Sequence, residues 1–80
     1  MNILLVEDDD AMATLLRDRF QLSGHGVARF DDGAAAWEAL RGSPLAFDLA
    51  VLAVPLPGLN GWALCRRIKS DEALRGLPVI

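Results

Sequence analysis

An α/β fold, in which a doubly wound parallel sheet lies between two layers of helices, is predicted by two observations and one general rule of topology. Short apolar runs alternate with segments of helical periodicity along the 80 residues. The apolar runs are continuous rather than alternating, which is typical of parallel strands that are buried on both faces. Strand–helix–strand crossovers are right-handed, which restricts the topology. We therefore expect one three-layer αβα domain over 1–80.

The first strand and the first helix are predicted between residues 2 and 24. Asn2 to Val6 is a short apolar run, and Gly24 is a residue that commonly ends a helix. Asp9 or Asp10 can cap this helix, and their charge suits the positive end of its dipole. The apolar residues expected to face inward from it are Met12, Leu15, Leu16 and Phe20.

The middle of the chain repeats the pattern of strand and helix. Gly26 to Phe30 is a weaker strand, and 31–33 is a turn that caps a second, shorter helix. That helix is expected to end near Gly42. Its inward residues are Ala36, Trp37 and Leu40. Phe47 to Ala53 is the third strand and the most apolar one.

The last part of the chain contains a loop, a third helix and the beginning of a strand. Pro55, Pro57 and Gly58 force the loop, and Gly61 opens the helix. Its inward residues are Leu64, Cys65 and Ile68. Leu77 to Ile80 begins a fourth strand. We expect the flavodoxin-like strand order 2-1-3-4, with the fifth strand missing.

The acidic residues are concentrated directly after the first strand. The net charge is −3, and Glu7 to Asp10 supply four of the eleven acids. Strands 1 and 3 are neighbours in this order, so Glu7, Asp8 and Ala53 should meet at one edge of the sheet, where such folds bind ligands. A cluster of like charges recruits a cation, although acids at a helix N-terminus can also serve only as caps.

Several classes of function are excluded by composition. No apolar run approaches the roughly 20 residues that span a bilayer, and the pattern of the first residues leads us to expect no secretory leader. The single cysteine, Cys65, cannot form an internal disulfide, which together with these absences favours the cytoplasm. The small basic group on the third helix (Arg66, Arg67 and Lys69) is interpreted as a solvated face, so we expect no nucleic-acid partner.

Four motifs in fixed order carry a resemblance to a known family. They are Leu5-Val6-Glu7-Asp8-Asp9, Asp32-Gly33, Leu56-Pro57-Gly58-Leu59-Asn60-Gly61 and Pro78-Val79-Ile80. Together they resemble the receiver domain of two-component response regulators, over the whole chain. The resemblance implies a histidine kinase or an output domain as partner. It also implies that the chain stops before the family's last switch elements, a Thr or Ser on strand 4 and a Lys on strand 5.

The same resemblance assigns roles to individual residues. Glu7 and Asp8 match the acidic pair that holds Mg²⁺, with the Pro55 carbonyl as a backbone ligand. Pro57 and Gly61 match residues that shape the loop. Ala53 stands where the family has the phosphoacceptor aspartate, which is also a metal ligand. A natural loss and an engineered substitution would both give this alanine.

Ala53 decides the functional hypothesis. Its methyl group can neither be phosphorylated nor bind metal, so we expect a phosphorylation-incompetent module with weak or absent Mg²⁺ that is no enzyme and acts by protein–protein interaction. Two alternatives remain open: a small Mg²⁺-dependent phosphotransfer or hydrolytic enzyme that uses Glu7 and Asp8, and a fragment of a longer regulator without function of its own.

The missing fifth strand leads to an expectation about assembly. An unpaired sheet edge exposes backbone N–H and C=O groups, so we expect a homo-oligomer through this edge. We also expect the apolar faces of strands 1 and 3, including Leu5, Val51 and Leu52, to be only partly covered.

Overall fold

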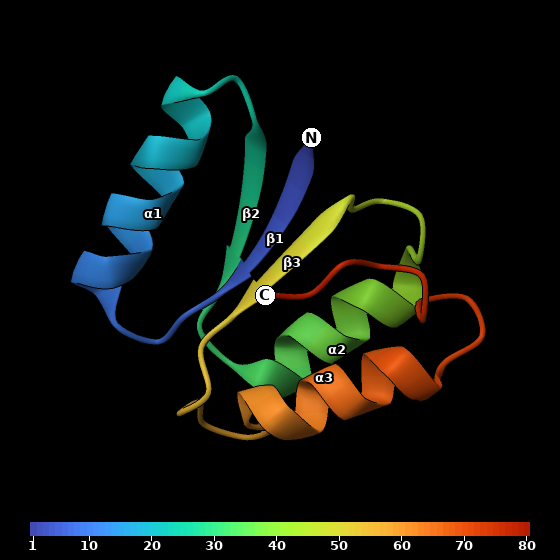
Figure 1. The fold of residues 1–80 in the computed structure, drawn as a ribbon. Coiled ribbons are helices and arrows are strands. Elements are labelled where there is room, and N and C mark those ends of the chain that lie inside the picture. Colours follow the sequence, from blue (N-terminus) through green and yellow to red (C-terminus); the bar gives the residue numbers. More distant parts are fainter.

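Three strands and three helices alternate along the chain in the computed structural model, which describes all 80 residues. They are β1 (Asn2–Val6), α1 (Asp10–Leu22), β2 (Gly26–Phe30), α2 (Gly33–Gly42), β3 (Leu49–Leu52) and α3 (Gly61–Ser70). Figure 1 shows α1 on one side of the sheet and α2 and α3 together on the other. The predicted three-layer αβα architecture is confirmed.

The sheet is parallel, and its strand order is β2-β1-β3, as expected for a doubly wound fold. Leu4, in the middle of β1, lies opposite Ala28 of β2 and Ala50 of β3. The expected fourth strand is present as a single parallel bridge between Ala50 and Val79. Residues 78–80 therefore lie beside the outer edge of β3 and make three backbone hydrogen bonds with it, each 2.9 to 3.0 Å long.

The core is divided by the sheet into two parts. Leu4 and Val6 belong to the larger part, which they share with buried residues of α2 and α3. Successive strand residues point to opposite faces, so Ile3 and Leu5 face α1. Leu5 is 1% exposed, and the expectation that it would be only partly covered was wrong, because α1 lies over it. Val51 and Leu52 are half-buried, as expected.

The apolar face of α1 is less buried than its periodicity predicts. Ala13 is the buried residue of this helix, whereas Met12 and Leu15 are 43% and 47% exposed, and Leu16 and Phe20 are half-buried. The prediction that Met12 and Leu15 face inward was therefore wrong. The reason is that α1 is the single helix on its side of a three-stranded sheet, so that only a narrow strip of its surface makes contact.

The ends of the elements follow local signals in the sequence. Asp9 caps α1, Asp32 caps α2 and Asn60 caps α3, each through its side-chain oxygen. After α1, Gly24 adopts a φ of +89°, which glycine accepts without strain. β3 is shorter than the predicted 47–53, although the N–H of Ala53 still donates to the Val6 carbonyl.

Candidate functional site

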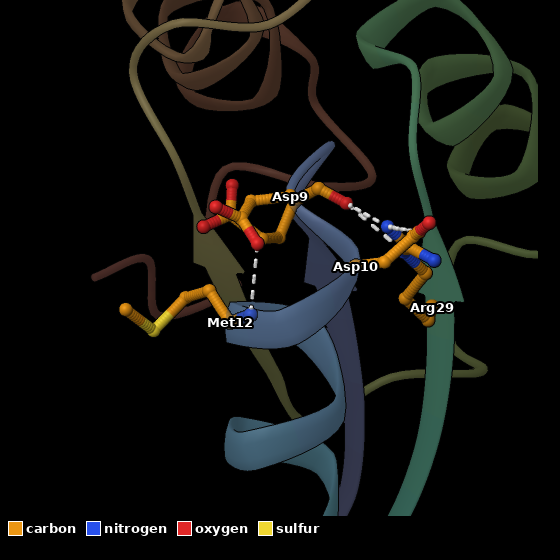
Figure 2. Close-up of polar contacts among 5 residues, drawn as sticks. Asp9, Asp10, Met12 and Arg29 are labelled. Carbon is orange, nitrogen blue, oxygen red and sulfur yellow. Dashed lines mark hydrogen bonds and ion pairs between the residues drawn. The ribbon is translucent and has the colours of Figure 1, made fainter.

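The four acids after β1 do not share one role. Asp9 accepts a hydrogen bond of 3.1 Å from the Met12 N–H, and Asp10 forms an ion pair of 3.0 Å with Arg29 (Figure 2). The carboxylates of Glu7 and Asp8 make no hydrogen bond or ion pair. Helix capping therefore accounts for Asp9, and the predicted pair, Glu7 and Asp8, is neither a cap nor part of an ion pair.

Arg29 is a residue of this site that the sequence reasoning missed. It lies on β2, and its Nε and Nη2 donate hydrogen bonds of 2.9 and 2.8 Å to the Glu7 carbonyl. The side chain is 23% exposed. A signal was available, because Arg29 is the only charged residue within the strand Gly26–Phe30.

Ala53 lies at the same edge of the sheet as Glu7. Its N–H donates a hydrogen bond of 2.9 Å to the carbonyl of Val6, the residue before Glu7. The predicted juxtaposition of the end of β1 and the end of β3 is therefore present. Ala53 is half-buried, and its side chain is a methyl group.

The loop between β3 and α3 is held by two glycines that have no room for a side chain. A Cβ on Gly33 would overlap the carbonyl oxygen of Leu59, and a Cβ on Gly61 would overlap that of Ala53. The N–H of Gly33 also donates to the Pro57 carbonyl, at 3.3 Å. Gly61 and Gly33 thus stand where the loop passes too close for a side chain, and Pro57 bonds to Gly33. The sequence placed Gly33 in a turn and cap and in the Asp32-Gly33 motif.

Three oxygen groups near this edge are the candidate ligands for Mg²⁺. Glu7 and Asp8 provide free carboxylates, and the carbonyl of Pro55, an exposed residue, accepts no hydrogen bond. Such groups suit Mg²⁺, which prefers oxygen ligands and retains several waters. Ala53 adds no oxygen, and the structure brings no three His, Cys, Asp or Glu side chains together as a metal site. The donor set therefore fits Mg²⁺ only in part.

A shallow apolar groove of about 210 Å³ lies beside the loop. It is lined by Leu52, Val54, Gly61, Trp62, Cys65, Val79 and Ile80. The largest of these side chains, Trp62, is 69% exposed. No helix of the chain has the length and apolar character needed to cross a membrane.

Comparisons with known proteins agree with this geometry. A family model described as the response regulator receiver domain matches residues 3–80. The transcriptional regulatory protein AfsQ1 of Streptomyces coelicolor is 41% identical over 79 residues, which cover 99% of this chain and 33% of that protein.

Solved structures show the same fold. The phosphorylated cyanobacterial phytochrome response regulator RcpA superposes with a TM-score of 0.90 at 33% identity, over 98% of this chain and 61% of that chain. The receiver domain of the sensor histidine kinase PA1611 of Pseudomonas aeruginosa PAO1, solved with a magnesium ion in its active-site cleft, gives a TM-score of 0.89 at 28% identity, over 98% and 62%. This chain thus spans less than two thirds of each relative, and it belongs to the response regulator receiver domain family.

Proposed function

We propose that this chain is a two-component receiver module that accepts no phosphoryl group at the usual position and acts by binding other proteins. The observation that supports this is the methyl group of Ala53, which lies beside the end of β1 while the carboxylates of Glu7 and Asp8 remain free. Phosphoryl transfer to a side chain requires a nucleophile, and a methyl group provides none. The module would work in the cytoplasm, which stays a prediction.

Incubation with acetyl phosphate and Mg²⁺ is expected to leave the intact mass of the chain unchanged. The matched positive control is Ala53→Asp, which restores a carboxylate at the same edge of the sheet and is expected to gain one phosphoryl group. Gain of a hydroxylamine-labile phosphate by the unsubstituted chain would show that another residue is the acceptor.

Ala53→Asp is also expected to tighten Mg²⁺ binding by about tenfold or more, because it adds a charged oxygen ligand to the partial shell of Glu7 and Asp8. The fluorescence of Trp62, at the start of α3, can follow the titration. Adding Asp8→Asn to this variant should reverse the gain. Equal affinities of the unsubstituted chain and Ala53→Asp would mean that Glu7 and Asp8 do not bind metal.

Receiver domains of this family interact with histidine kinases and output domains. We infer that the apolar groove around Val54 and Trp62 is the part of this chain that meets a protein partner, since exposed apolar side chains that gather on one surface mark interaction sites.

Self-association through a sheet edge is expected at micromolar concentration. Residues 78–80 pair with the outer edge of β3, so the edge expected to be open is the outer side of these residues. Their backbone N–H and C=O groups on that side are available to a second copy of the chain. The sedimentation coefficient should therefore rise with protein concentration. A parent chain that sediments as a monomer at every concentration would contradict self-association.

A further inference from the structure

Arg29 holds the backbone of the loop that carries the acids, rather than the free carboxylates. Two of its N–H groups donate to the Glu7 carbonyl, at 2.9 and 2.8 Å, and its Nη2 also lies 3.0 Å from Asp10. Asp10 is 92% exposed, so solvent screens this ion pair strongly. The two partly buried bonds to the carbonyl are therefore the stronger part of the contact.

These bonds extend the pairing of β1 and β2 beyond the end of the strands. The Glu7 N–H donates to the Phe30 carbonyl at 3.0 Å, which is the last backbone bond between the two strands. β2 ends at Phe30, and no backbone N–H of the following turn donates to the Glu7 carbonyl. The guanidinium takes the place of that donor, and the Glu7 backbone is held at both its N–H and its C=O.

We propose that Arg29 is a positioning residue, a built-in cation that fixes the loop of Glu7 to Asp10 without a bound metal ion. A guanidinium keeps its charge at all physiological pH values, so it reduces the repulsion among the four acids permanently. Because it binds the carbonyl of Glu7 and the carboxylate of Asp10, the carboxylates of Glu7 and Asp8 stay free. The order of the loop is thereby independent of Mg²⁺.

Amide hydrogen exchange of the full chain tests this role. Arg29→Gln is expected to raise the exchange rate of the Glu7 amide by about tenfold or more relative to the Ala53 amide, which bonds to the other side of β1. Arg29→Lys keeps the charge but loses the planar pair of donors, so it should raise the rate as well. Arg17→Gln removes a half-buried arginine that makes no bond and should change nothing.

In the parent chain, addition of Mg²⁺ should leave the exchange rate of the Glu7 amide within about twofold of its value without metal. Protection of the Glu7 amide that develops only with Mg²⁺ would overturn the role of Arg29, as would equal exchange rates of this amide in the parent chain and in Arg29→Lys. These two measurements test the role of Arg29 even if Arg29→Gln fails to fold. The role of Arg29 rests on the proposed function of the same edge, but separate experiments test the two proposals. Phosphorylation of the unsubstituted chain would contradict the proposed function and would leave the exchange rates of the Glu7 amide unchanged.

Discussion

Gly33→Ala is expected to lower the free energy of unfolding by about 3 kcal/mol or more, because the added methyl group overpacks a site whose neighbouring atoms cannot move away. The new Cβ would overlap the carbonyl oxygen of Leu59, which is a backbone atom and cannot rotate away. Either α2 or the loop between β3 and α3 must move. A domain of this length has roughly 4 to 12 kcal/mol of stability, so a large part of it would be lost.

Urea unfolding followed by circular dichroism measures this loss, and α2 itself provides the matched control. A Cβ on Gly42, at the end of the helix, meets no atom within 4 Å. Gly42→Ala should therefore leave the stability unchanged or raise it by up to about 1 kcal/mol, because alanine favours a helix more than glycine does. Similar midpoints for the two variants would contradict the close approach of Gly33 and Leu59.

The second large effect is expected from Leu4→Ala, at the centre of the middle strand. Leu4 is 0% exposed and packs in the core with buried residues of α2 and α3. Truncation of such a leucine removes apolar contacts and leaves a cavity, at a cost of about 2 to 5 kcal/mol. In so small a domain we expect a large unfolded fraction at room temperature or a strongly lowered melting temperature.

A leucine on the surface gives the comparison for this prediction. Leu45, between α2 and β3, is 92% exposed, and Leu45→Ala should change the free energy of unfolding by less than about 0.5 kcal/mol. Thermal melts compare the two variants, and both are measured at the same protein concentration to exclude an effect of association. Equal melting temperatures for Leu4→Ala and Leu45→Ala would mean that the packing around β1 is not what stabilises the fold.

Local signals were sufficient for the order of the elements and for the edge where the site lies. Apolar runs and helical spacing predicted the three strands and three helices that form, because burial on both faces of a strand is visible in its residues. The fourth predicted strand is reduced to one bridge at Val79. The cap at Asp9 was one of two predicted candidates. The meeting of Glu7 and Ala53 followed from topology, since neighbouring parallel strands end at the same edge.

The pattern along a single helix was a weaker guide to burial. Met12 and Leu15 have the spacing of a core-facing stripe, yet both are exposed, while Leu5 is covered although incomplete cover was expected. How far an apolar stripe is buried depends on the width of the surface opposite it, and the stripe itself does not contain this information.

Residue type and short-range periodicity were enough to predict the α/β class and to show that Ala53 provides no carboxylate. The strand order followed from the general topology of alternating strands and helices. How the site is held could be learned from the three-dimensional packing alone. Arg29 and Glu7 are 22 residues apart in the sequence and are joined by a hydrogen bond. Gly33, at the start of α2, lies against Leu59 in the loop before α3. Such contacts arise from the register of β1 and β2 and from the packing of α2 against the loop, where distances of a few tenths of an ångström decide whether a side chain fits.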